Sequence, residues 1–187
     1  MNIIEEILYK LDHDNYDENK AIPEHKPEML LIGCVDARKD PTTDLGIERG
    51  RALILRNIGA LIRGTTVSPE QRETESAALE FAVKVMEVKH IVVMGHTDCG
   101  GIRASLQETE LKAIKKYLSP LDNLRSEVKS YNMTLDEQAR LMEIQAVKMS
   151  IKNLLSYEYI QAAVDKGTLS VHGWLIDIAS GKLTQIA

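Results

Sequence analysis

The sequence contains little cysteine and few aromatic residues. Among 187 residues there are two cysteines, one tryptophan and one phenylalanine, and no Cys-x-x-Cys pair occurs. So few cysteines exclude a disulfide-rich secreted scaffold, and the missing pair argues against a dithiol redox protein and against the usual structural zinc modules. Both cysteines are therefore expected to be reduced, and we expect a cytoplasmic protein.

An excess of positive charge and long apolar runs are also absent. The net charge is −5, whereas nucleic acids and anionic membranes attract basic surfaces. No apolar run approaches the roughly 20 residues of a transmembrane helix, and the acidic start of the chain does not resemble a signal peptide. We therefore expect no nucleic-acid partner and no membrane partner. The length of 187 residues predicts one domain over residues 1–187, in which residues 1–27 form a helix and an arm.

Short apolar runs bounded by turn-forming residues alternate with amphipathic segments along the chain. The runs are Met29–Gly33, Ala52–Leu55, Ile91–Gly95 and Leu169–Trp174. This alternation predicts an α/β fold with a mostly parallel central sheet flanked by helices. Two further apolar stretches on either side of Ser180 and Gly181 predict an edge hairpin at the C-terminus.

Two helix starts are predicted from capping residues, at Ser68 and at Thr134. The capping box at Thr134–Glu137 predicts a helix that extends to about Leu155, and Ser68 followed by Pro69 predicts another helix. Apolar spacing predicts the buried faces of these two helices, which are Ala77, Ala78, Phe81, Ala82 and Val85 in the earlier one and Leu141, Ile144, Val147, Ile151 and Leu155 in the later one. The same spacing over Ile3–Leu11 predicts a short amphipathic helix.

Both cysteines and one histidine follow predicted strands. Cys34 comes after the first apolar run, and His96 and Cys99 come after the third. Because the carboxyl ends of neighbouring parallel strands meet at one edge of a sheet, we expect these side chains to converge. Two thiolates and an imidazole suit zinc, and three ligands with one exchangeable position are typical of catalytic zinc sites. The structural alternative is two buried thiols and a hydrogen-bonded histidine.

Asp36 and Arg38 stand beside Cys34 and point to the same side of an extended segment. Two arrangements are compatible with this spacing. Asp36 can bind the metal and close the site, or it can pair with the Arg38 guanidinium and leave the fourth position to water. Water on zinc can become a nucleophile near neutral pH.

These segments resemble the β-class carbonic anhydrases. The motifs that carry the resemblance are Cys34-Val35-Asp36-Ala37-Arg38, Arg56-Asn57-Ile58-Gly59, Gly95-His96-Thr97-Asp98-Cys99-Gly100-Gly101 and His172-Gly173-Trp174, in this order along most of the chain. The resemblance implies the family's α/β fold, Zn²⁺ as cofactor, and reversible hydration of CO2 to bicarbonate and a proton by zinc-bound hydroxide. It also implies a homodimer or a dimer-based tetramer, in which the N-terminal helix packs on the partner subunit. The apolar spacing of that helix is equally compatible with packing on its own domain.

The resemblance assigns roles to individual residues. Cys34, His96 and Cys99 are the implied zinc ligands, and Asp36 is the fourth ligand in a closed form. In the active form Asp36, fixed by Arg38, orients the hydroxide.

The implied substrate-binding residues are Ile58, Gly59, Gly100 and His25. Ile58 and Gly59 lie in a loop beside the CO2 pocket, although Gly59 can instead serve only a left-handed turn. Gly100 lies at a predicted helix start, where backbone N–H groups favour anions. His25 stands where many plant-type members carry an anion-binding glutamine, and a plain loop histidine is the alternative.

Three other functions remain compatible with these residues. One is hydrolysis of another small linear molecule, such as carbon disulfide, on the same fold. The second is a non-enzymatic zinc protein in which Asp36 stays on the metal, although such a site would not need Arg38. The third is a thiol redox protein that uses Cys34 and Cys99, which one equivalent of tightly bound zinc would exclude.

Overall fold

The computed structural model describes residues 2–5, 8–9, 24–107 and 109–187. Within these residues the chain forms one five-stranded sheet with the strand order β2-β1-β3-β4-β5. The strands are β1 (Met29–Cys34), β2 (Ala52–Asn57), β3 (His90–His96), β4 (Ser170–Ile176) and β5 (Leu183–Gln185). The first four are parallel, and β5 pairs with β4 in the antiparallel direction. The predicted α/β fold, including its C-terminal edge hairpin, is confirmed.

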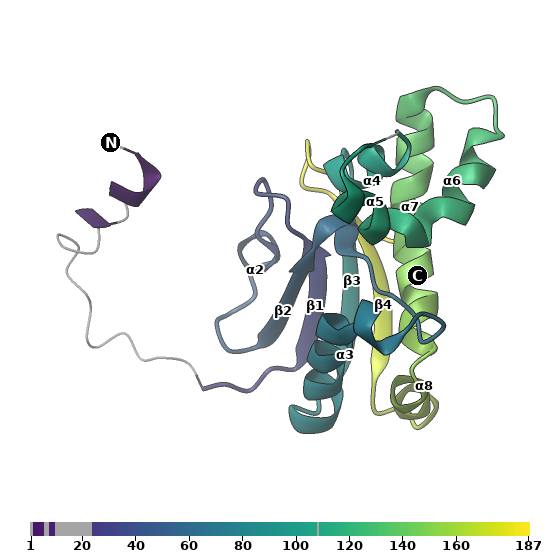
Figure 1. Cartoon of the computed structure of the whole chain (residues 1–187). Helices are drawn as coiled ribbons and strands as arrows, with labels where there is room; N and C mark the ends of the chain where they lie inside the picture. Colours follow the sequence, from purple (N-terminus) through teal and green to yellow (C-terminus); the bar gives the residue numbers. More distant parts are fainter. Residues whose placement is uncertain (1, 6–7, 10–23, 108) are drawn as a thin grey trace.

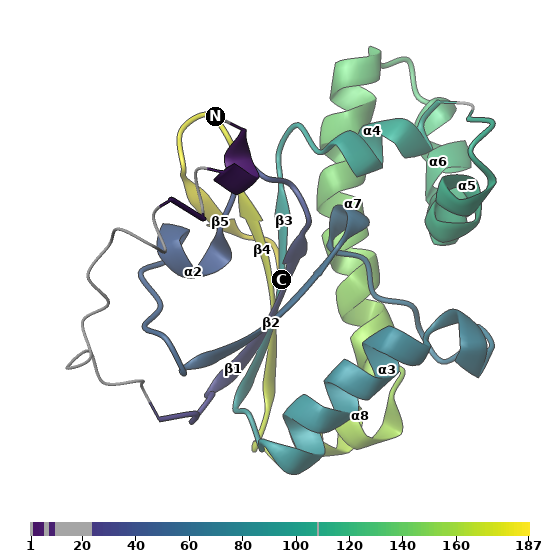
Figure 2. The same cartoon turned by 60° about the vertical axis from the view of Figure 1, so that its left-hand side comes forward.

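Helices cover the sheet unevenly. The helices are α2 (Pro41–Asp44), α3 (Glu73–Glu80), α4 (Gly100–Ser105), α5 (Lys112–Leu118), α6 (Asp122–Lys129), α7 (Leu135–Leu155) and α8 (Glu158–Asp165). Figure 2 shows α3, α7 and α8 along one face of the sheet and the short α2 on the other. The sequences of β1 and β3 contain continuous apolar runs because these central strands bury side chains on both faces of the sheet.

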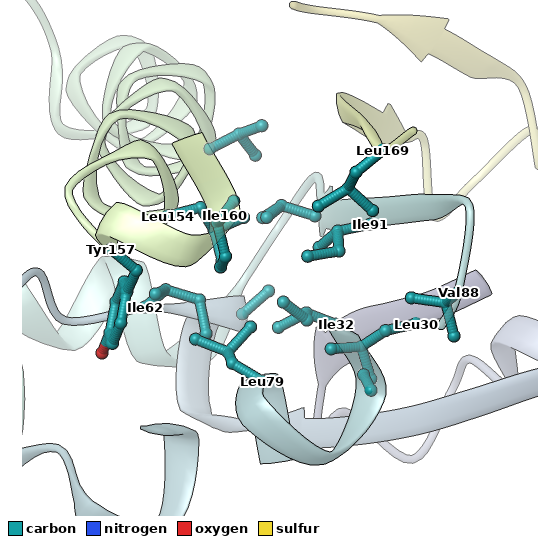
Figure 3. Packing of buried hydrophobic residues seen from close by; sticks show 14 residues of the cluster. Leu30, Ile32, Ile62, Leu79, Val88, Ile91, Leu154, Tyr157, Ile160 and Leu169 are labelled. Carbon is teal, nitrogen blue, oxygen red and sulfur yellow. The ribbon is translucent and has the colours of Figure 1, made fainter. Parts of the chain in front are cut away.

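The main core lies between the sheet and the layer formed by α3, α7 and α8. Figure 3 shows Leu30 and Ile32 of β1 and Ile91 of β3 packed against Leu79 of α3 and Ile160 of α8. All five side chains are almost completely inaccessible to solvent. Burial of this kind contributes about 1.5–3 kcal/mol of folding free energy per large aliphatic side chain. These contacts therefore stabilise the positions of β1 and β3, whose carboxyl ends carry Cys34 and His96.

Helix α7 begins and ends where its sequence predicts. The Thr134 hydroxyl accepts the N–H of Glu137, and the Glu137 carboxylate accepts the N–H of Thr134, which completes the capping box. The predicted buried face is only partly correct, because Val147 is buried whereas Leu141, Ile144, Ile151 and Leu155 are only partly buried. The fully buried residues also include polar ones and are Ala139, Met142, Glu143, Ala146, Val147, Ser150 and Leu154.

The buried face predicted for α3 and the turn after it is wrong at Ala77, which is exposed, and at its two largest residues. Phe81 is 44% exposed and Val85 is 64% exposed, while Leu79 and Ala82 are buried. The chain begins this region with a 3-10 turn, continues as α3 and then forms a π turn over Phe81–Val85. The buried residues of this region, Glu75, Leu79 and Ala82, are spaced as one face of a helix. This face includes a charged residue, because Glu75 is ion-paired with Arg63 at 2.6 Å, so a stripe drawn from apolar residues alone lies on a different side.

A close contact between β3 and α7 makes Gly95 sensitive to substitution. A Cβ atom at Gly95 would lie 2.7 Å from Cγ2 of Val147. We therefore expect Gly95→Ala to lower the free energy of unfolding in urea by about 1–3 kcal/mol, as overpacking of a core does. In the double variant with Val147→Ala the clash is relieved, so the two costs should be less than additive. Additive costs would contradict this packing.

The N-terminal helix predicted over Ile3–Leu11 lies partly outside the described residues. Residues 3–5 and 8–9 are helical, and Ile3, Ile4 and Leu8 are exposed. Most of the predicted arm up to residue 27 also lies outside. None of the helices in the described part of the chain combines the length and apolar character that crossing a bilayer requires.

Candidate metal centre

Three potential metal ligands meet at the carboxyl ends of β1 and β3. Cys34 is the last residue of β1, His96 is the last residue of β3, and Cys99 is the cap of α4. Their ligand atoms all lie within 4.8 Å of one another, and the two sulfur atoms are 3.9 Å apart. Figure 1 shows α4 near the upper, carboxyl-terminal ends of the strands. The fold therefore brings Cys34 to His96 and Cys99, although Cys34 and Cys99 are 65 positions apart in the sequence.

His96 presents one ring nitrogen to this cluster. Its Nδ1 donates a hydrogen bond to the carbonyl of Thr97 at 2.9 Å, which fixes the ring and leaves Nε2 as the free nitrogen. Nε2 is buried and has no hydrogen-bond partner among the described residues. A buried polar atom without a partner is costly. A metal ion held by Nε2 and the two thiolates would remove that cost, so the residues fit a zinc ion.

The surroundings of the two thiols shift their pKa values in opposite directions. The contact with Cys99 lowers the pKa of Cys34 and raises that of Cys99, so one of the two sulfurs carries the charge when no cation is near. The backbone N–H of Gly59 also points to the Cys34 sulfur at 3.4 Å. Burial lowers the pKa of His96, but the nearby Cys34 sulfur and the hydrogen bond to the Thr97 carbonyl outweigh that effect and raise it.

Asp36 is bound by Arg38 rather than grouped with the ligand atoms. Nε of Arg38 donates to Oδ1 of Asp36 at 2.9 Å, and Nη2 donates to Oδ2 at 2.7 Å. This two-point pairing holds the pKa of Asp36 well below its usual range. Oδ2 is still only 3.8 Å from Nε2 of His96. Of the two arrangements left open by the sequence, the structure has the one in which Arg38 holds the carboxylate beside the cluster.

Arg56 anchors the loop that follows β1. This residue belongs to a motif of the resemblance but had no predicted role. Its Nε donates to the carbonyl of Cys34 at 2.8 Å, and Nη2 donates to the carbonyls of Asp36 and Lys39 at 2.7 and 2.9 Å. One side chain from β2 therefore fixes the backbone on both sides of Asp36.

Glu143 anchors the loop that follows β3, and sequence reasoning did not identify it. It lies on α7, its side chain is 2% exposed, and it accepts the backbone N–H of Cys99 at 2.9 Å. Arg140 donates to its other oxygen at 3.1 Å. Burial raises the pKa of Glu143, although the Cys99 N–H and Arg140 oppose this rise. A cavity of about 300 Å³ adjoins this carboxylate.

Two substitutions separate the hydrogen bond of Glu143 from its charge. Glu143→Ala leaves the buried Cys99 N–H without an acceptor, so the free energy of unfolding should fall by about 1–3 kcal/mol, and the bound zinc should decrease. Glu143→Gln keeps an acceptor oxygen and should lose less than half as much. Urea unfolding and metal analysis of both variants provide the test. Equal losses in the two variants would mean that the charge, and not the hydrogen bond, holds the loop.

The predicted substrate-binding residues have different positions. Ile58 packs with the cluster around Cys34 and Cys99, and Gly59 has a left-handed φ of 76° in addition to its contact with the Cys34 sulfur. Gly100 is the first residue of α4, with open space at its Cα. His25 is exposed and precedes β1, so it lies near the amino-terminal end of that strand, whereas the cluster lies at the carboxyl end. The fold of one chain therefore does not bring His25 to this site.

Three comparisons relate the chain to known proteins. A family model described as "Carbonic anhydrase" matches residues 29–183. The mitochondrial beta carbonic anhydrase 6 of Arabidopsis thaliana is 34% identical over 164 residues, which are 84% of this chain and 56% of that protein. The chain thus spans little more than half the length of that relative.

One bacterial and one fungal protein match this chain over more of their own length. A carbonic anhydrase of Helicobacter pylori is 28% identical over 188 residues, covering 93% of this chain and 85% of that protein. A crystal structure from a study of two tetrameric beta-carbonic anhydrases of Sordaria macrospora superposes with a TM-score of 0.79 at 29% identity, covering 97% of this chain and 91% of that one.

Proposed function

The chain belongs to the β-class carbonic anhydrase family, and from this premise we propose that it catalyses the reversible hydration of CO2 to bicarbonate and a proton. The observation that carries the proposal is the meeting of Cys34, His96 and Cys99 with an unpartnered Nε2. These three residues would hold a zinc ion and leave a fourth position, as catalytic zinc sites do. Zinc, when bound there, would lower the pKa of a water molecule toward about 7 and so supply the nucleophile.

Asp36 and Arg38 control the geometry beside that position. The Asp36 carboxylate is ionised throughout the neutral range because Arg38 lowers its pKa. Its Oδ2 is near Nε2 of His96, so it is placed to accept a hydrogen bond from the reacting water. That bond would orient a lone pair of the water oxygen toward CO2. Arg38 contributes by keeping Asp36 out of the fourth position.

The pocket for CO2 lies at the start of α4 in this proposal. Ile58 supplies an apolar side chain there, and a Cβ atom at Gly101 would come within 2.4 Å of its Cγ2. Gly101 therefore lets α4 approach the loop that carries Ile58 and Gly59. In this proposal the apolar side chain of Ile58 suits a linear, uncharged substrate, whereas the backbone N–H groups at Gly100 and Gly101 favour the bicarbonate product.

The pH dependence of CO2 hydration tests the proposed function. Asp36 stays ionised and Arg38 stays protonated, because their pKa values move away from neutrality. Neither group therefore changes its charge between about pH 6.5 and about pH 9, and a rise in kcat with pH must come from a group whose pKa is near 7, as expected for water on zinc. Stopped-flow kinetics should show this rise. Constant activity over the range would reject the proposed nucleophile.

We also propose a homodimer or a dimer-based tetramer located in the cytoplasm. The support for oligomers is that the Sordaria macrospora relatives are described as tetrameric. The support for the location is the pair of free cysteines, which a reducing compartment would keep available for zinc. Light scattering of the purified protein tests the assembly, and a monomer would contradict it.

A further inference from the structure

The Arg38 guanidinium has a second acidic partner besides Asp36. Its Nη1 donates to Oδ2 of Asp98 at 2.8 Å, and its Nη2 donates to the backbone carbonyl of Asp98 at 2.9 Å. Asp98 directly precedes Cys99 in the loop after β3, whereas Arg38 belongs to the loop after β1. One guanidinium thus bonds both loops that carry the metal ligands.

The backbone at Asp98 is shaped for this contact. Its φ is 56°, in the left-handed region that side chains other than those of Gly, Asn and Asp rarely adopt. In this conformation both the carboxylate and the carbonyl of Asp98 accept hydrogen bonds from Arg38. An aspartate meets both requirements of the position, namely the conformation and the acceptor.

The two loops are otherwise anchored to different parts of the fold. Arg56 of β2 holds the loop of Cys34, and Glu143 of α7 holds the loop of Cys99. Arg38 and Asp98 join the two loops directly. The Arg38 guanidinium is thus held against Asp36 from the loop of Cys99 as well as from its own loop.

We propose that Asp98 is a positioning residue of the metal centre: it holds the outer edge of the Arg38 guanidinium and thereby keeps both ligand loops, and Asp36, in their working arrangement. The inference rests on the proposed zinc-dependent function. Asp98 acts through Arg38 and does not contact the ligand atoms itself.

The size of the effect follows from exposure and geometry. The Arg38 side chain is 46% exposed and that of Asp98 is 62% exposed, and an isolated exposed ion pair contributes little to stability. This guanidinium, however, is bonded to two carboxylates and a carbonyl, which fixes it more firmly than a single pair would. Changes in the partners of metal ligands typically cost 10–100-fold in metal affinity. Asp98 is exposed and acts one step further from the ligands, through Arg38, so we expect an effect at the low end of this range, about tenfold.

The test uses two variants and a matched control. Asp98→Gly keeps the left-handed backbone but removes the carboxylate, whereas Asp98→Asn keeps one acceptor oxygen for Arg38. Asp136→Ala is the control, because it removes an exposed Asp–Arg pair of 2.7 Å, formed with Arg103, that does not involve Arg38. The zinc dissociation constant is measured by chelator competition. The visible absorption spectrum of the cobalt-substituted protein is measured in parallel.

We expect Asp98→Gly to weaken zinc binding about tenfold and to change the cobalt spectrum. Asp98→Asn should restore most of the affinity, and Asp136→Ala should match the wild type. Wild-type affinity and an unchanged spectrum in Asp98→Gly would overturn the inference, as would an equal loss in Asp136→Ala. Both readouts are independent of CO2 hydration. A wild-type protein that binds zinc but is inactive would therefore reject the proposed function without bearing on Asp98.

Discussion

Replacing Asp36 by asparagine should lower kcat for CO2 hydration by about a hundredfold or more while the protein keeps its zinc. The loss is expected because the new amide side chain would carry no charge and would turn an N–H₂ group toward either Arg38 or the reacting water. The wild-type carboxylate receives two hydrogen bonds from Arg38. Losing a positioned proton acceptor typically costs 10²–10⁴-fold in rate. Zinc should be retained because Asp36 is not one of the three grouped ligands.

Stopped-flow CO2 hydration and metal analysis of the same preparation measure the two parts of this prediction. Asp44→Asn is a suitable control, since Asp44 ends the short helix α2 and lies outside the cluster. The control should retain wild-type activity. If Asp36→Asn were as active as the control with its zinc in place, Asp36 would have no part in the reaction. If it lost its zinc, Asp36 would have to be reclassified as a ligand.

Replacing His96 by alanine should remove both zinc and activity. His96 supplies the only nitrogen of the grouped ligands, and its Nε2 is buried without a partner among the described residues. With two sulfur atoms left, the site has too few ligands for a tetrahedral zinc ion. We expect less than about one tenth of the wild-type zinc content and a rate indistinguishable from buffer, because the nucleophile depends on the metal.

His90→Ala is the control for this variant because it removes the histidine at the other end of the same strand. His90 bonds Ser170 at 2.7 Å and is not among the grouped ligands. It should keep its zinc and its activity. Zinc bound to His96→Ala at one equivalent per chain would contradict the ligand set.

Local sequence signals predicted much of the fold correctly. The apolar runs of β1 and β3, the capping box of α7 and the turn at Ser180-Gly181 each depend on neighbouring residues, so a pattern within one segment suffices to find them. The buried faces of α3 and α7 were harder to predict. Apolar residues occur on more than one side of these helices, and only the packing of the whole chain decides which side faces the sheet.

In the candidate site, too, some residues were predictable from local sequence and others were not. Cys34, His96 and Cys99 were predictable because they are rare residue types at strand ends, and Asp36 and Arg38 because they are adjacent to one of them. Glu143 was not predictable, since it reaches Cys99 across 44 positions from the middle of a helix. A glutamate in a helix is usually a solvated residue. Its role arises only from the way α7 crosses β3.

The most direct test of this account is CO2 hydration by one preparation in three states: loaded with zinc, stripped by a chelator, and reloaded. If zinc at Cys34, His96 and Cys99 supplies the nucleophile, the loaded protein should hydrate CO2 fast, lose the rate on stripping, and recover it with one equivalent of zinc per chain. A rate that survives stripping, or a protein that holds one zinc per chain and does not hydrate CO2, would contradict it.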